Sequence, residues 1–151
     1  MATTVAFDDA ASLVGTDLGT SDWLDITQAR IDLFADATDD HQWIHIDPVR
    51  AKDGPFGTPI AHGYLTLSLP IPLWTDLLDV TGVSTKVNYG LNKVRFPAPV
   101  PAGSRIRLIG RVVQVQQVSG DGIQITADVT LEIDGSDKPA CVAQPVFRFY
   151  R

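Results

Sequence analysis

The sequence has few of the features that would place it in a special class. Of its 151 residues only Cys141 is a cysteine, which excludes an internal disulfide and a cysteine-based zinc site. No apolar run approaches the roughly 20 residues of a membrane-spanning helix, and the N-terminus carries acids in place of a signal peptide's basic flank. We therefore expect a cytoplasmic protein with no membrane partner. Its length and 44% hydrophobic content predict one globular domain over residues 1–151.

Acidic residues are absent from residues 81–120, although the whole chain has a net charge of −6. Residues 1–80 hold 13 acids and three bases, whereas residues 81–120 hold six bases. The net charge argues against nucleic acid as a partner, and the basic block is a candidate anion site. The alternative is that these bases lie on solvated strand faces and pair with acids from the first half of the chain. The six bases are Lys86, Lys93, Arg95, Arg105, Arg107 and Arg111.

Helices are expected in the first half of the chain. Residues 28–37 have apolar side chains at helical spacing, and Thr27 is a suitable N-cap. Asp47 and Pro48 resemble the cap and first residue of a short second helix. Residues 63–82 are apolar almost throughout, which predicts one long buried helix that two internal prolines should kink.

From residue 83 the sequence pattern is that of strands. Apolar and polar side chains alternate without fault over residues 123–133, and the alternation within residues 104–118 slips near Gly110, as a bulge would make it. One apolar helix followed by three or four long antiparallel strands predicts an α+β fold. Because a helix that is apolar on every side must be surrounded, we expect a curved sheet wrapped around it.

All three histidines lie in residues 37–63, which we interpret as an active site. Asp40 and His45 would point about 140° apart on a helix, so they converge only if this segment turns. A convergent carboxylate and imidazole can hold one water and move its protons. Gly63, at the start of the long helix, offers a free N–H to an oxyanion. Such groups suit the addition of water across a double bond conjugated to a carbonyl.

Each of these residues also has a structural explanation. Asp40 alone is compatible with a turn cap, and His45 between two isoleucines is compatible with a hydrogen-bonded core residue. His62 is better explained as a residue that supports the backbone than as a catalytic residue. A metal site of Asp40, His41, His45 and His62 is a further alternative, but one His-x-x-x-His spacing is weak evidence. We expect no metal.

Two motifs resemble the signature of the MaoC-like dehydratases, the (R)-specific enoyl-CoA hydratases (hydratase 2) of the hot-dog fold. The first is Asp-Asp-His-Gln-Trp-Ile-His-Ile-Asp-Pro at residues 39–48, and the second is Ala-His-Gly at residues 61–63. Residues 88–96, followed by a proline-rich corner, are also similar. The resemblance extends from about residue 21 to the C-terminus.

The resemblance implies that Asp40 and His45 share the catalytic water and that the Gly63 N–H donates to the thioester oxygen. It implies coenzyme A as the carrier and a homodimer whose two sheets join into one. Gln42 stands where many members have Asn, and we expect it to orient the water or the histidine. Some members use a serine on the central helix, and Ser68 is the nearest one here.

We therefore predict a homodimeric enzyme that hydrates trans-2-enoyl-CoA reversibly to (R)-3-hydroxyacyl-CoA, with acyl-CoA as substrate and no cofactor. We expect Gln42, together with Lys93 and Arg95 of the acid-free block, to bind substrate. Two alternatives stay open on the same fold. One is an acyl-CoA thioesterase, and the other is a non-catalytic subunit that binds acyl-CoA.

Overall fold

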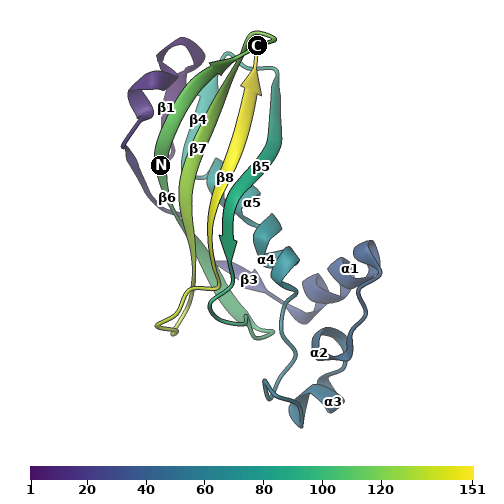
Figure 1. Ribbon diagram of the computed structural model, residues 1–151. Coiled ribbons are helices and arrows are strands. Elements are labelled where there is room, and N and C mark those ends of the chain that lie inside the picture. The colour runs from purple at the N-terminus through teal and green to yellow at the C-terminus, as the bar shows by residue number, and fades with distance from the viewer.

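The computed structural model describes residues 1–151 and is dominated by one curved antiparallel sheet (Figure 1). The expected α+β class is confirmed. The strands are β1 (Thr3–Ala6), β2 (Asp17–Thr20), β3 (Leu24–Ile26), β4 (Leu78–Thr81), β5 (Thr85–Arg95), β6 (Ser104–Val118), β7 (Gly122–Ile133) and β8 (Cys141–Tyr150). The helices are the 3-10 helix η1 (Phe7–Leu13) and α1 (Gln28–Thr38), α2 (Trp43–Ile46), α3 (Pro48–Lys52), α4 (Gly63–Ser68) and α5 (Pro70–Thr75).

The main sheet has the strand order β2-β6-β7-β8-β5, and β3 also pairs with β6. All of these pairings are antiparallel. The bounds of β6 agree with the expected strand, and all six residues of β7 predicted to point inward are buried. The bulge in β6 lies at Val113, three residues after the predicted position, where the register with β7 shifts.

The predicted helix over residues 63–82 is wrong in its extent. Leu69 separates α4 from α5, because Pro70 has no N–H to continue the ladder. Helix α5 ends at Thr75, and the next residues form β4, which pairs in parallel with β1. The helical segment is also not buried all round, since Tyr64 is mostly exposed. None of the helices is both long and apolar enough to cross a bilayer.

The core lies between the concave face of the sheet and helices α4 and α5. Leu65, Leu69 and Leu73 are buried along the helices, and each contributes roughly 1.5–3 kcal/mol by leaving water. The Trp74 ring packs so closely on Gly110 that a Cβ atom there would lie 3.2 Å from it. Packing therefore fixes both helices on the sheet, and with them the start of α4.

Cys141 lies in β8 and is fully buried, as expected of an inert thiol. Burial raises the pKa of the Cys141 thiol to about 11, so the group stays protonated at neutral pH.

Helices α1, α2 and α3 form a group beyond the end of the sheet, next to the N-terminus of α4 (Figure 1). The predicted caps are confirmed here: Thr27 Oγ1 accepts from the Arg30 N–H at 3.1 Å, and Asp47 Oδ1 accepts from the Arg50 N–H at 3.0 Å. All three histidines come from this region, so the fold gathers them at one end of the molecule.

Candidate active site

The chain turns sharply between α1 and α2. Helix α1 ends at Thr38, and its C-cap Asp39 has a φ of 58°, a left-handed conformation that aspartate tolerates better than most residues. Helix α2 begins only at Trp43, so Asp40 and His45 do not share a helix. The expected turn is thus present, and the two side chains are free to face each other.

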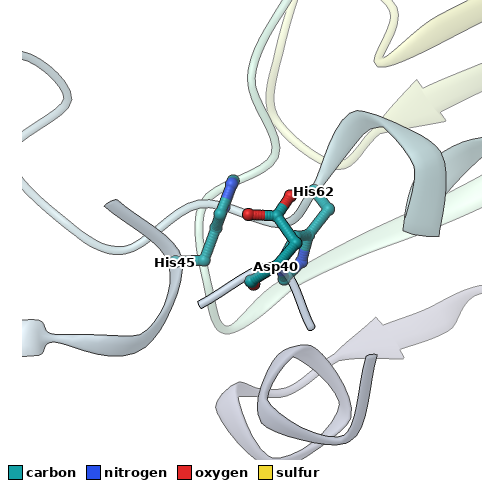
Figure 2. Close-up of side chains that lie close together, drawn as sticks. All are labelled: Asp40, His45 and His62. Carbon is teal, nitrogen blue, oxygen red and sulfur yellow. The ribbon is translucent and has the colours of Figure 1, made fainter. Parts of the chain in front are cut away.

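The side chains of Asp40, His45 and His62 lie together (Figure 2). One carboxylate oxygen and one nitrogen from each ring all lie within 4.8 Å of one another. Asp40 is exposed, whereas His45 and His62 have only 6% and 2% of their surface exposed. The cluster therefore has a wet side, formed by the carboxylate, and a dry side, formed by the two rings.

A main-chain acceptor fixes the orientation of the His45 ring. Its Nδ1–H donates to the carbonyl oxygen of Ile60 at 2.7 Å, and the Ile60 N–H donates to the Ile44 oxygen at 3.0 Å. With the proton on Nδ1, the neutral ring presents a lone pair at Nε2, which has no partner in the protein. Burial is the main cause that lowers the pKa of His45, with a smaller contribution from His62, and this favours the neutral ring.

His62 lies behind His45. The two rings stack with their centroids 3.8 Å apart, and Phe34 packs on His62 at 4.8 Å. The Nε2–H of His62 donates to the main-chain oxygen of Asp40 at 2.9 Å, while its Nδ1 is buried without a partner. His62 thus contacts both Asp40 and His45 without exposing a free nitrogen to solvent.

Gly63 follows His62 and begins α4, and its N–H donates to no acceptor in the chain. The ring of Phe96 lies over it, since a Cβ atom built on Gly63 would be 3.4 Å from that ring. A mostly apolar cavity of about 280 Å³ opens here, with Gly63, Phe56, Phe96 and Ala140 in its wall. Gly63 therefore directly follows one of the two stacked histidines and lines an apolar cavity.

A family model described as MaoC like domain matches residues 9–133, most of the chain. The chain belongs to the MaoC-like dehydratase family. A curated relative, 3-hydroxyacyl-thioester dehydratase Z of Mycobacterium tuberculosis, is 53% identical over 141 residues, which are 93% of each protein.

Solved structures agree with this assignment. The monoamine oxidase regulatory protein from Archaeoglobus fulgius has a TM-score of 0.77 and 25% identity, over 100% of this chain and 99% of that one. The (R)-hydratase from A. caviae involved in PHA biosynthesis has a TM-score of 0.70 and 23% identity, over 89% and 94%, and supports the fold alone. The fold of this MaoC-like chain is thus the expected hot-dog fold.

The basic block of this MaoC-like dehydratase divides into two groups. Four of its six bases pair with acids outside the block, namely Lys86 with Asp79, Arg111 with Asp17, Arg105 with Asp134 and Arg107 with Glu132. Only Asp79 and Asp17 belong to the first half of the chain, from which the alternative explanation expected all the partners. Lys93 and Arg95 are exposed near the end of β5 and form no ion pair. Arg95 is two residues from the proline corner and adjacent to Phe96, which lines the cavity.

Three other candidate residues form no side-chain hydrogen bond to Asp40, His45 or His62. The Gln42 side chain is exposed and makes no hydrogen bond, although its main-chain oxygen accepts from the His45 N–H at 3.0 Å. Ser68 donates to the oxygen of Leu65. His41 contacts Asp36 at 2.9 Å, and that hydrogen bond raises the pKa of His41.

Geometry also disfavours a metal at the cluster. A histidine binds metal through a lone pair in the plane of its ring. The His45 and His62 rings are stacked at 21°, so their in-plane lone pairs run side by side and do not converge. His41, needed for the His-x-x-x-His alternative, is not in the group. The absence of a metal remains a prediction that this arrangement supports.

One residue of the site had no sequence signal. Gln28, the first residue of α1, donates from Nε2 to the main-chain oxygen of His45 at 2.7 Å. The two residues are 17 positions apart in different helices, so neither a motif nor a helical period connects them.

Proposed function

We propose that this chain is a hydro-lyase that adds water to trans-2-enoyl-CoA, forms (R)-3-hydroxyacyl-CoA and catalyses the reverse dehydration. The observation that supports it best is the separation of up to 4.8 Å between the Asp40 carboxylate and the imidazole of His45. A water with two hydrogen bonds of about 2.8 Å bridges acceptors roughly 4.5–5 Å apart. Asp40 and neutral His45 are both acceptors, so one water donates a hydrogen to each.

Hydration in this arrangement starts from the held water. Its oxygen bonds to Cβ of the substrate while one of the two acceptors takes a proton from it. The electron pair of the double bond moves toward the thioester oxygen, where the Gly63 N–H stabilises the enolate. A proton is then delivered to Cα, and both acceptors return to their starting states. No cofactor is needed, because the water supplies both the hydroxyl group and the proton.

The surroundings suggest where the remainder of the substrate binds. The apolar cavity beside Gly63 suits an acyl chain, and the unpaired Lys93 and Arg95 suit the phosphates of coenzyme A. The name of the curated mycobacterial relative, a 3-hydroxyacyl-thioester dehydratase, describes the same reaction in the dehydration direction.

The experiment is a hydration assay with a short trans-2-enoyl-CoA. We expect the absorbance of the conjugated thioester to fall, a product with (R) configuration at C3 and no release of free thiol. Release of thiol from saturated acyl-CoA would instead assign the chain as a thioesterase. Binding of the enoyl-CoA without turnover would assign it as a non-catalytic subunit.

We further propose that the chain acts as a homodimer joined through β5. This strand is an edge of the sheet that pairs only with β8, and an unpaired edge of 11 residues invites a partner strand. Val87, Tyr89 and Leu91 on this strand are 40%, 57% and 46% exposed. Sedimentation should give a dimer, and Leu91→Lys should shift it toward monomer. A wild-type monomer at assay concentrations would contradict this.

A further inference from the structure

We propose that Gln28 and His62 are positioning residues that set the separation between the Asp40 carboxylate and the His45 ring. The inference rests on the proposed function, and neither residue is assigned to the chemistry itself. Each supplies one side-chain N–H to a main-chain oxygen. His62 Nε2–H donates to the oxygen of Asp40 at 2.9 Å, and Gln28 Nε2–H donates to that of His45 at 2.7 Å.

The segment that carries the pair has little structure of its own. Asp40 lies between a helix end and a helix of only four residues, α2, which is far too short to be stable alone. Its internal support is limited to short-range bonds, such as that from the His45 N–H to the Gln42 oxygen. Besides the hydrogen bonds of Ile60 with Ile44 and His45, contacts from other elements must therefore fix where the two side chains point.

Both external donors are themselves held in place. Gln28 begins α1, directly after the Thr27 cap, and its amide also donates to Asp32 Oδ1 at 2.9 Å. His62 is buried between Phe34 and His45. One donor comes from α1 and the other from the residue before α4. The main-chain oxygens of Asp40 and His45 are therefore hydrogen-bonded to two separate, packed parts of the fold.

The chemistry of His62 fits a positioning role better than proton transfer. Its Nε2 hydrogen is already donated to a carbonyl, which has no proton to return. Its Nδ1 is buried without a partner, so it has no route to substrate or water. In contrast, His45 keeps a free Nε2, and Asp40 is exposed. His45 therefore has a free nitrogen for the proposed proton transfer, whereas His62 has no accessible one and serves to position the segment.

Loss of either hydrogen bond, from Gln28 or from His62, should reduce turnover more than substrate binding. A shift of about 1 Å in catalytic groups costs on the order of 10²-fold in rate. We expect Gln28→Leu and His62→Phe each to lower kcat by roughly 10- to 100-fold, with KM changed by less than about threefold. His62→Phe keeps an aromatic ring for stacking and removes the Nε2–H donor together with the unpartnered Nδ1.

Two variants serve as matched controls. His62→Gln keeps an N–H donor at a similar reach and loses the stacked ring, so it should recover much of the kcat lost in His62→Phe. Asp32→Ala removes the second partner of Gln28 and leaves its bond to His45, so it should keep near wild-type kcat. Melting temperatures of all variants report on folding.

The outcomes are separable. Folded Gln28→Leu and His62→Phe variants with wild-type kcat would overturn the inference while leaving the proposed hydratase intact. If His62→Phe does not fold, Gln28→Leu decides alone, because Gln28 is only half-buried. If the wild type shows no hydration, the proposed function fails. Amide hydrogen exchange then still tests the two hydrogen bonds from Gln28 and His62. Both variants should exchange faster over residues 40–45, and unchanged exchange would contradict the positioning role.

Discussion

The Nδ1–H of His45 donates to the main-chain oxygen of Ile60 at 2.7 Å. This contact leaves Nε2 as the free nitrogen and directs it toward the exposed Asp40 carboxylate (Figure 2). It also connects the two sequence motifs, because His45 belongs to the first and Ile60 directly precedes the second. The pairing of the motifs thus has a physical basis in one hydrogen bond.

Activity should persist below the ordinary pKa of histidine. Burial, the largest cause, lowers the pKa of His45 from 6.5, and the ring accepts a hydrogen bond from water only when neutral. We expect the acidic limb of kcat/KM to lie below pH 6.5, with activity lost as pH falls through the pKa of the folded protein. An acidic limb above pH 6.5, in measurements of kcat/KM across a series of pH values, would contradict this.

The same shift predicts a pH dependence of stability. A histidine with a lowered pKa binds fewer protons in the folded state than in the unfolded one, so the free energy of unfolding increases with pH across that interval. The contribution is present above pH 6.5 and is lost as pH falls to the folded pKa. His41 has a raised pKa and acts in the opposite direction, but it is exposed and solvent screens it. Urea titrations of wild type and His45→Gln at pH values from 5 to 8, around the ordinary pKa of histidine, give the free energy of unfolding at each pH. This free energy should rise less steeply with pH in the variant.

Gly63→Ala should separate folding from catalysis. The nearest atoms to a Cβ atom there belong to the Phe96 ring, at 3.4–3.5 Å, and Gly63 does not have a positive φ. The variant should therefore fold with a melting temperature close to wild type. The added methyl group lies beside the free N–H and obstructs the thioester oxygen. We expect kcat/KM to fall by about 10²-fold, as for loss of an oxyanion donor. Full activity would show that this amide is not used.

Lys93→Ala and Arg95→Ala test the carrier site. Each should raise KM for an enoyl-CoA by roughly 3- to 10-fold, as expected for an exposed charge contact of up to about 1.4 kcal/mol, with little change in kcat. The effect should vanish with an enoyl-pantetheine thioester, which lacks the nucleotide phosphates. Arg105→Ala is the control, because Arg105 pairs with Asp134. Equal effects on both substrates would exclude phosphate binding by these residues.

Local patterns in the sequence predicted local structure well. The Thr27 cap and the Asp47–Pro48 helix start depend on neighbouring residues alone and are confirmed. The alternation over residues 123–133 holds for its six apolar residues, whereas Thr126, expected to point outward, is buried. The helix predicted from the apolar run after residue 63 is too long because β4 forms only where β1, at the N-terminus, supplies its hydrogen bonds. That pairing leaves no mark in the local pattern.

The site shows the same division. Asp40, His45 and Gly63 follow from motif and helix position. The structure brings Asp40 and His45 together with His62, and Gly63 directly follows His62 in the chain. Charge alone does not distinguish Lys93 and Arg95 from the other bases of the block. The ion pairs of Arg107 with Glu132 and of Arg105 with Asp134 depend on strand register. The contacts of Gln28 and His62 with main-chain oxygens depend on how separate elements pack, which one sequence does not reveal.

Asp40→Asn and His45→Gln address the central claim most directly, with Asp39→Asn as a control because Asp39 is an exposed neighbouring carboxylate and asparagine accepts its left-handed conformation. The measurement is the hydration rate of a short trans-2-enoyl-CoA by folded variants at pH 7.5. If one water is held between Asp40 and His45, each of the two site variants should lose on the order of 10²-fold or more in kcat, and the control should not. Near wild-type turnover in both Asp40→Asn and His45→Gln would contradict the account.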